Sequence, residues 1–549
     1  MKSVRLPRSG RPLRPASQPV PLWKLYALLF AALSAAHIGL LGLPYYWDEA
    51  GYYIPAAWDF YRTGSLIPIT TLTNAHPPLP SLYLAIVWHL AGFAPVVTRL
   101  AVVAVAALGL LAVWRLALKL AGSSAVAVWT VVLTALYPVW FAQSALAHAD
   151  IFAAACALWG LVWTLPARER NPRAAAAWFA AAALAKETSI GIPAALAAYA
   201  LFEALRSVGE RRRRAVAEAA WLAATALPLA AWFAYHRFKT GFLFGNPEFL
   251  RYNAQANLSP LRFLAAFGHR LLHLSAHMNL FVPVLMAAAA LLLAPRQDAE
   301  GHTCDGLEPV PLARIWTLIA VEAALFSILG GALLTRYLLP VYPLVLLLAL
   351  VTLRRRAPGW QWLAAVSAVA FVAGLGINPP YGFAPEDNLA YARFVRLQQQ
   401  AIHELEQRYP GATVLSAWPA TDELHKPELG YVREPFDVTP IENFTSDEID
   451  KAAENPESYS VALVFSTKYD PPNPLFTLGA GSRRLDQQYF GLHQDLPPEE
   501  IARRLHGTLV WKHEDQGLWA ALIRFNRQWE AQSAPPGSPG AAGQTHSGL

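Results

Sequence analysis

The sequence is poor in cysteine and in charged residues for its length. Of its 549 residues, 2 are cysteines and 15% are charged, whereas 55% are hydrophobic. Two cysteines exclude a disulfide framework; Cys156 lies in an apolar run and Cys304 in a polar loop, and we interpret both as free thiols. So little charge beside so much apolar surface favours a polytopic membrane protein with a substantial polar part.

The sequence also lacks the motifs of common cofactor sites. It contains no internal repeat, Walker loop, dinucleotide-binding fingerprint or zinc-ligand spacing, so no cofactor and no metal is expected. His269, His273 and His277 recur every four residues, but Arg270 lies among them without a paired carboxylate, so we interpret them as one face of an interfacial helix. The net charge of +6 comes from basic residues between apolar runs, which indicates topology and not nucleic-acid binding.

Apolar runs of about 20 residues predict an α-helical membrane domain over residues 22–377. Eleven spans are expected near 23–43, 97–117, 125–143, 148–165, 174–185, 189–205, 215–235, 276–294, 314–335, 337–353 and 360–377. Every charged residue before Asp48 is basic, which places the N-terminus in the cytoplasm, with a disordered segment over 1–21.

Segment 80–93 is apolar but, at about 14 residues, short for a crossing. If it lies at the interface, four basic loops fall on the cytoplasmic side; if it crosses, all four fall outside. Those loops contain Arg115 and Lys119; Arg168, Arg170 and Arg173; Arg206 and Arg211 to Arg214; and Arg354, Arg355 and Arg356. The positive-inside rule therefore favours an interfacial helix and eleven spans, with the C-terminus outside.

The C-terminal part, residues 378–530, loses the long apolar runs. Helical patterns at 387–409, 445–454 and 497–505 alternate there with β-type runs at 412–417, 461–466, 508–512 and 518–525. This alternation predicts an extracytoplasmic α/β domain. The Pro-, Gly- and Ser-rich tail, 531–549, is expected to be disordered.

Polar residues from five separate segments are expected at one membrane face. Asp48 and Glu49 follow the first span, and Asn74-Ala75-His76-Pro77-Pro78 precedes the interfacial helix. The other segments contribute His148 and Asp150, Lys186 and Glu187, and Arg336 and Tyr337. Each alone has an ordinary explanation as a helix start, turn or interface anchor. Together they indicate a site, because charged groups next to hydrocarbon are costly and usually face a cavity.

Both signs of charge suit the transfer of a sugar from a lipid-linked phosphate. A carboxylate accepts a proton from an acceptor hydroxyl or orients it. Lysine and arginine stabilise the negative charge that grows on the departing phosphate, so a metal ion is not required. The polyprenyl tail stays in lipid, so this chemistry belongs at a membrane surface.

The five motifs also occur in an order that resembles the polytopic C-class glycosyltransferases. The similarity is greatest to bacterial relatives of protein O-mannosyltransferases and to lipid A aminoarabinose transferase, and it covers about residues 20–380. It implies a polyprenyl-phosphate sugar donor and a hydroxyl acceptor on a lipid, glycan or protein. By this resemblance Asp48 is the candidate base, Glu49 and Asp150 shape the site, and Lys186 and Arg336 hold phosphate.

The remaining candidates, His76, His148, Glu187 and Tyr337, are expected to bind substrate beside these residues. The resemblance places the protein in the bacterial inner (plasma) membrane. Two alternatives remain at this point. A transporter would use Asp150, Lys186 and Glu322 to line a path, although transporters usually show repeats and charges near mid-bilayer. A non-catalytic envelope scaffold would use the C-terminal domain to bind partners or glycans.

Overall fold

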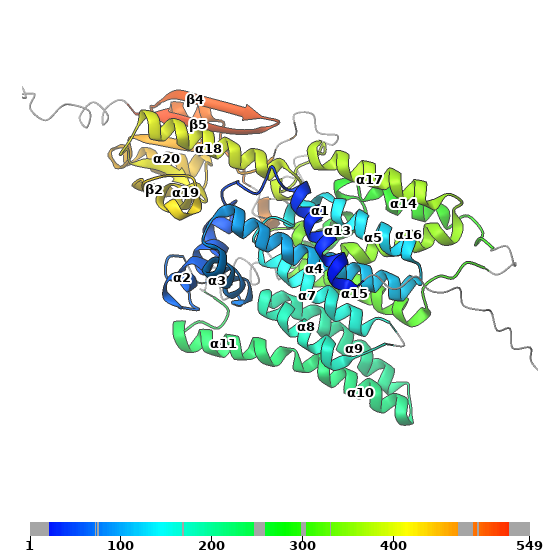
Figure 1. Ribbon diagram of the computed structural model, residues 1–549. Helices are drawn as coiled ribbons and strands as arrows, with labels where there is room; N and C mark the ends of the chain where they lie inside the picture. Colours follow the sequence, from blue (N-terminus) through cyan, green and yellow to red (C-terminus); the bar gives the residue numbers. More distant parts are fainter. Residues whose placement is uncertain are drawn as a thin grey trace, which may run out of the picture.

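The computed structural model describes residues 21–71, 73, 76–166, 169–245, 259–297, 303–329, 331–469, 471, 487–490 and 493–525. The predictions of disorder for 1–21 and 531–549 lie, except for Pro21, outside these residues, as do Asn74, Ala75 and Arg168. Within them the protein is a large helical bundle joined to a small domain with a β-sheet (Figure 1).

The bundle begins with α1 (Leu22–Ala36) and ends with α17 (Trp360–Gly376). Between them lie α2 (Ile54–Thr63), α3 (Leu79–Ala91), α4 (Pro95–Ala121), α5 (Ser124–Leu136), α6 (Pro138–Gln143), α7 (Ala149–Thr164), α8 (Pro172–Ala185), α9 (Gly191–Leu205), α10 (Gly209–Ala224), α11 (Ala226–Thr240), α13 (Pro260–Ser275), α14 (Phe281–Ala290), α15 (Pro309–Ile328) and α16 (Tyr342–Arg356).

Small residues let the central helices approach closely. A Cβ on Gly160 of α7 would lie 2.5 Å from the Phe179 ring of α8, and one on Gly109 of α4 would lie 3.3 Å from the Ala155 Cβ of α7. Alanine and glycine are common at such contacts because apolar lipid gives helices little other reason to associate. The helix α7, which carries Asp150, is therefore fixed between α4 and α8.

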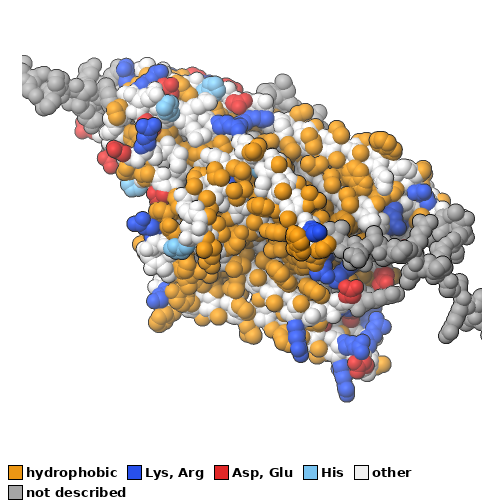
Figure 2. All heavy atoms as spheres, in the orientation of Figure 1, with side chains coloured by type: hydrophobic (Ala, Val, Ile, Leu, Met, Phe, Trp, Pro, Cys, Tyr) orange, Lys and Arg blue, Asp and Glu red, His pale blue; other side chains and the backbone are white. Residues whose placement is uncertain are grey.

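The outside of the bundle is apolar, as in an integral membrane protein. Figure 2 shows hydrophobic side chains across its middle, between the charged C-terminal domain and the basic end of α10. Among the described residues, four helices are long and apolar enough to cross a membrane, or five if the bent pair α13–α14 counts as one span. The expected number of eleven spans therefore stays a prediction.

Several expected spans are interrupted. Run 23–43 forms a helix only to Ala36, followed by turns that include Gly39 and Gly42. Run 125–143 is divided by Pro138, which begins α6 and cannot donate the backbone hydrogen bond of an uninterrupted helix. Run 276–294 opens with a 3₁₀ turn at a bend of 101° after α13. Proline, glycine and positive-φ positions thus shorten helices that hydropathy alone reads as continuous.

The basic loops gather at one end of the bundle. Lys119, in the last turn of α4, pairs with Glu169 before α8. Arg354, in the last turn of α16, donates to the Ala121 carbonyl. Arg170 pairs with Glu218 of α10. The four loops used in the topology argument therefore share an end, as the prediction requires.

Both ends of α3 lie at the opposite end of the bundle from these loops. His76, before α3, contacts Glu187 after α8 at 3.0 Å. Trp88 in the last turn of α3 donates to Thr98 at the start of α4. Since α4 runs from there to the basic loops, α3 enters and leaves on the same side. This is the arrangement expected of an interfacial helix.

The C-terminal domain contains a five-stranded sheet of order β2-β1-β3-β5-β4. Its strands are β1 (Val414–Ala417), β2 (Val438–Ile441), β3 (Val461–Phe465), β4 (Thr508–Asp515) and β5 (Leu518–Arg524), with helices α18 (Ala390–Arg408), α19 (Ala420–His425), α20 (Ser446–Ala453) and α22 (Pro498–Arg504). Strands β2, β1 and β3 are parallel, whereas β5 is antiparallel to β3 and β4. Helix α18 packs on β5 and β4.

This α/β domain was predicted, except for β2 and α19. The edge strand β2 is short and contains Pro440, which interrupts a β-type pattern and is tolerated only where a strand has a free edge. The domain boundary at 378 stays a prediction.

The domain is docked on the loop that carries Asp48. Trp418, after β1, packs edge-on against Trp47, and a Cβ on Gly51 would lie 2.5 Å from the Trp418 indole. Tyr431 donates to the Tyr45 carbonyl. Trp47 has a φ of 45°, which costs energy for a bulky residue and is held by this aromatic packing. The C-terminal domain therefore helps to set the position of Asp48.

Candidate functional site

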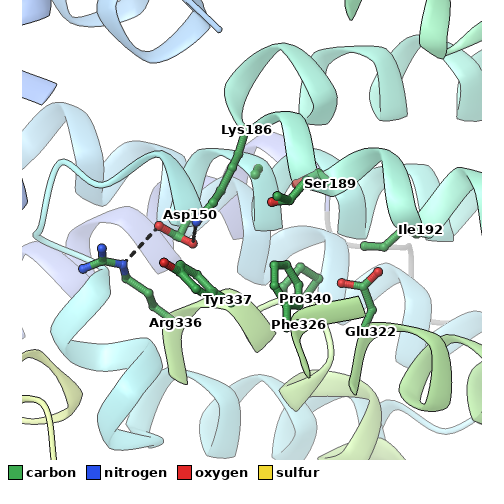
Figure 3. A pocket seen from close by; sticks show the side chains of 11 residues that line it. Asp150, Lys186, Ser189, Ile192, Glu322, Phe326, Arg336, Tyr337 and Pro340 are labelled. Carbon is green, nitrogen blue, oxygen red and sulfur yellow. Dashed lines mark hydrogen bonds and ion pairs between the residues drawn. The ribbon is translucent and has the colours of Figure 1, made fainter. Parts of the chain in front are cut away.

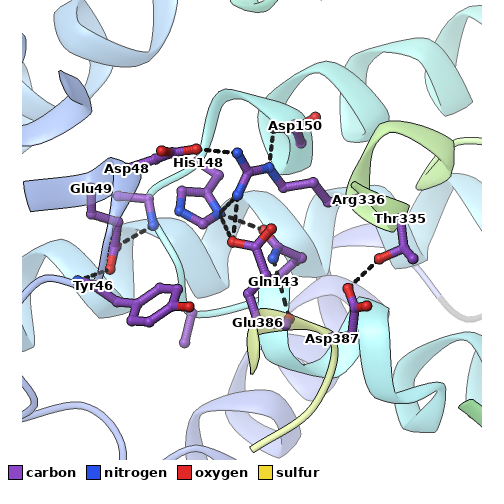
Figure 4. Close-up of polar contacts among 12 residues, drawn as sticks. Tyr46, Asp48, Glu49, Gln143, His148, Asp150, Thr335, Arg336, Glu386 and Asp387 are labelled. Atoms are coloured by element: carbon purple, nitrogen blue, oxygen red, sulfur yellow. Dashed lines mark hydrogen bonds and ion pairs between the residues drawn. The ribbon is translucent and has the colours of Figure 1, made fainter. Parts of the chain in front are cut away.

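The candidate site is centred on Arg336 (Figure 4). Arg336 lies in a 3₁₀ turn between α15 and α16, is 3% exposed, and faces three carboxylates. Its Nε lies 3.3 Å from Asp150 Oδ2, and its two terminal nitrogens contact Asp48 and Glu386. Burial alone would lower the pKa of Arg336, but these carboxylates hold it well above its usual value.

Lys186 supplies a second cation to the same cluster. Its Nζ lies 2.5 Å from Asp150 Oδ1 and 3.9 Å from the centre of the Tyr337 ring. The lysine follows the last residue of α8, where the chain leaves the helix in an extended conformation. Asp150 thus bridges two cations that come from positions 150 residues apart in the sequence.

Glu49 anchors the loop and does not face the cavity. It is completely buried, and its carboxylate lies 2.6 Å from Arg99 Nη1 and accepts from the backbone N–H groups of Ala147 and Tyr46. Arg99 also donates to the Pro44 carbonyl. With its hydrogen bonds satisfied, Glu49 fixes the loop next to α4 and the start of α7. Of the adjacent pair, Asp48 is the residue with an exposed side chain, at 19%.

Two histidine rings pack near the ring of Tyr53. The rings of His76 and His148 are 5.7 and 5.8 Å from it, centre to centre. His148 is completely buried beside the Arg336 guanidinium, with Nδ1 2.8 Å from Gln143 Oε1, so its imidazole stays neutral. His76 pairs with Glu187 at the partly exposed rim. Burial opposes the ionisation of Glu187, but His76 lowers its pKa below the usual value.

A polar pocket opens between the charged side chains around Arg336 and the helix α15 (Figure 3). Its walls include Asp150, Lys186, Arg336 and Tyr337. Glu322 of α15 also lines it, is 1% exposed, and has no hydrogen-bond partner for Oε1 among the described residues. A second hollow is lined by Tyr52, Tyr53, His76 and Trp232 among others.

Sequence reasoning missed the acidic segment after α17. Glu386 contacts Arg336. Asp387 accepts a hydrogen bond from Thr335, the residue before Arg336, and lies 2.9 Å from His277. The signal was available, since Pro385-Glu386-Asp387 follows the last apolar run at the face where the other polar motifs lie. Arg99 was also missed, because it lies within a run that hydropathy assigns to a span.

All nine candidate residues therefore lie around one region, in two groups. Asp150, Lys186, Arg336 and Tyr337 line the pocket, and Asp48 contacts Arg336 next to it. Glu49, His76, His148 and Glu187 flank or support this group. Within the described residues no group of three or more histidine, cysteine, aspartate or glutamate side chains has metal-binding geometry. The cluster brings two cations and three carboxylates together beside one pocket.

Comparison with known proteins confirms the predicted resemblance. Residues 75–233 match the model of the dolichyl-phosphate-mannose-protein mannosyltransferase family. The crystal structure of ArnT from Cupriavidus metallidurans bound to undecaprenyl phosphate aligns with a TM-score of 0.52 at 18% identity, covering 90% of this chain and 98% of that one. The chain has the ArnT fold.

The same enzyme in its apo state gives a TM-score of 0.51 at 15% identity, over 91% of this chain and 98% of the other. No curated protein matches the chain at a significant level. Because each ArnT alignment covers 90% or more of this chain, it includes at least part of the C-terminal sheet domain.

Proposed function

We propose that the protein is a membrane glycosyltransferase that moves a sugar from a polyprenyl-phosphate donor to an acceptor hydroxyl. The observation that carries the proposal is the convergence of Lys186 and Arg336 on one pocket, with Asp48 in contact with Arg336. The ArnT fold and the mannosyltransferase family model support the same class of reaction, and the ArnT structure with undecaprenyl phosphate supports the donor. The sugar and the acceptor are not specified by these observations.

In this mechanism the two cations hold the donor phosphate. The acceptor oxygen attacks C1 of the sugar, and its proton passes to a carboxylate. The bond between C1 and the phosphate oxygen breaks with its electron pair remaining on phosphate, where Lys186 and Arg336 stabilise the added charge. Asp48 is the best placed base, because it is the most exposed of the three carboxylates around Arg336. The cations are already in place and need no metal ion.

The site is proposed to face the extracytoplasmic side of the bacterial inner membrane. The clustering of the basic loops at the other end of the bundle supports this orientation. A reporter fused after Phe383 is expected to be active only outside the cytoplasm. A reporter that is cytoplasmic at this position would place the site on the wrong side and reject the proposed orientation.

The direct test supplies purified protein with a panel of polyprenyl-phosphate sugars and measures release of polyprenyl phosphate together with sugar linked to the acceptor. Turnover that depends on Asp48 supports the proposal. Movement of an unmodified sugar across sealed vesicles would indicate the transporter alternative. Binding of envelope glycans without turnover of any donor would indicate the scaffold.

A further inference from the structure

The structure assigns Glu386 to the donor site: we propose that its protonated carboxyl group donates a hydrogen bond to the donor phosphate while Arg336 holds that phosphate. This inference rests on the proposed function. Glu386 comes from the segment that joins the membrane domain to the C-terminal domain, and the family model, which spans 75–233, does not include it.

The first argument is the position of Glu386. Its carboxylate contacts an Arg336 terminal nitrogen, which is one of the groups proposed to bind phosphate. It is 3% exposed, and its Oε1 has no hydrogen-bond partner within the described part of the chain. A buried polar atom without a partner is costly, and a hydrogen bond to a ligand is one way to satisfy it. Figure 4 shows this carboxyl directed into the cluster between His148 and Arg336.

The second argument is the charge of the cluster. Two cations, Lys186 and Arg336, share three carboxylates, those of Asp48, Asp150 and Glu386. If all ionise, the empty site carries one net negative charge and would repel phosphate. Protonation of one carboxylate makes the site neutral and supplies an O–H donor for the phosphate oxygen.

Glu386 is the carboxylate best placed to take that proton. Asp150 contacts both cations, and Asp48 is exposed to water at 19%, whereas Glu386 is buried and shares its single cation with the other two. The neighbouring groups are His148, which is neutral, Gln143, which donates to the Glu386 carbonyl, and Asp387, which disfavours a further negative charge. Burial raises the pKa of Glu386 to about 8, even with Arg336 beside it.

The third argument is rigidity. Asp387, the next residue, accepts hydrogen bonds from Thr335 and lies 2.9 Å from His277 Nε2. The contact between Asp387 and Thr335 therefore holds the two segments together and keeps Glu386 next to Arg336. A carboxyl group at this position would lie next to the bound phosphate, and as a neutral acid it does so without repulsion.

The test measures binding of undecaprenyl phosphate to the purified full-length protein between pH 7.5 and 9.5, where the second ionisation of the phosphate, near pH 6, is complete. Because binding favours protonated Glu386, affinity is expected to be constant below about pH 8 and to fall above it, approaching about tenfold per pH unit. Glu386→Gln, which keeps the shape and a donor but cannot ionise, is expected to retain its affinity at pH 9.5.

The matched control is Glu423→Gln. Glu423 is also a buried glutamate whose pKa burial raises well above its usual value, but it lies in α19, where the neighbouring Asp422 raises it further. This variant is expected to show the wild-type pH profile. Infrared spectroscopy of the empty protein near pH 7 supplies a second readout: the band of a protonated carboxylic acid should lose intensity in Glu386→Gln.

The outcomes separate the two proposals. Saturable binding with the same pH profile in wild type and Glu386→Gln would overturn the role of Glu386 and leave the glycosyltransferase proposal standing. No saturable binding in any variant at any pH would reject the donor class itself. Binding that weakens with pH in wild type and Glu423→Gln, but not in Glu386→Gln, is the expected result.

Discussion

Two clusters of buried arginine and carboxylate side chains lie near opposite ends of α15, and they differ in charge balance. Near the basic loops, Arg170 and Arg314 pair with Glu203 and Glu218. That cluster has two positive and two negative groups. At the other end, Lys186 and Arg336 share three carboxylates next to a pocket.

We interpret the balanced cluster as structural and the unbalanced cluster as the proposed site. A balanced network compensates its own buried charges, and removing a member leaves one of them unpaired. The Arg336 cluster has more carboxylates than cations, so its charges balance only if one carboxylate is protonated or moves away. Either change removes a negative charge that would oppose an anionic ligand. The presence of buried arginine alone would not have distinguished the two clusters, since both contain it.

The strongest expected effect in the unbalanced cluster is that of Asp48→Asn. The amide keeps the shape but cannot accept the acceptor proton, so sugar transfer should slow by about 10²- to 10⁴-fold. Undecaprenyl phosphate should still bind, because Lys186 and Arg336 are retained. Transfer assays with a polyprenyl-phosphate sugar and binding assays on the same preparation check both parts. Near-normal turnover at equal expression would transfer the role to another carboxylate, Asp150 first.

A substitution in the balanced cluster should lower the stability of the protein and leave its lipid binding unchanged. Arg314→Met leaves Glu203 and Glu218 with Arg170 as their remaining partner, and breaking such a buried pair costs about 3–5 kcal/mol. We expect a lower unfolding temperature in detergent and an unchanged Kd for undecaprenyl phosphate in the protein that remains folded. Weaker lipid binding without loss of stability would mean that the balanced cluster is also part of a site.

Much of the fold could be predicted because hydropathy reports apolar helices directly. The breaks could not, since run 276–294 bends where Met278 adopts a φ of 47°, a conformation that its side chain does not suggest. Helix α2 was also missed, because it is short and mixed in polarity. The β-type runs located four of the five strands, and β2 was lost to Pro440.

The sequence could predict which candidate residues lie at the same face of the membrane. Counting spans placed Asp48, Asp150, Lys186 and Arg336 at one face, and they meet there. The number of spans could not show which of these side chains contact one another at that face. Glu49 is adjacent to Asp48 in sequence, yet it is buried against Arg99 and fixes the loop, a difference that only packing determines.

The smallest effect concerns how Lys186 and Arg336 share one phosphate. Each charge-assisted hydrogen bond to phosphate is worth roughly 1.5–3 kcal/mol, so Lys186→Ala or Arg336→Ala should weaken donor use by about tenfold or more. Arg336→Lys should restore only part of it, because a guanidinium that forms two parallel hydrogen bonds becomes a point charge.

The double variant decides whether the two cations act together. In the empty protein they already share Asp150, so their effects are linked before any ligand binds. A double-mutant cycle should therefore be measured twice, for unfolding and for binding of undecaprenyl phosphate. A coupling energy above about 0.5 kcal/mol in binding, beyond that seen in unfolding, is the expected result. If the coupling appears in unfolding alone, the lysine and arginine only neutralise Asp150, and the Arg336 cluster is a structural one like that of Arg314.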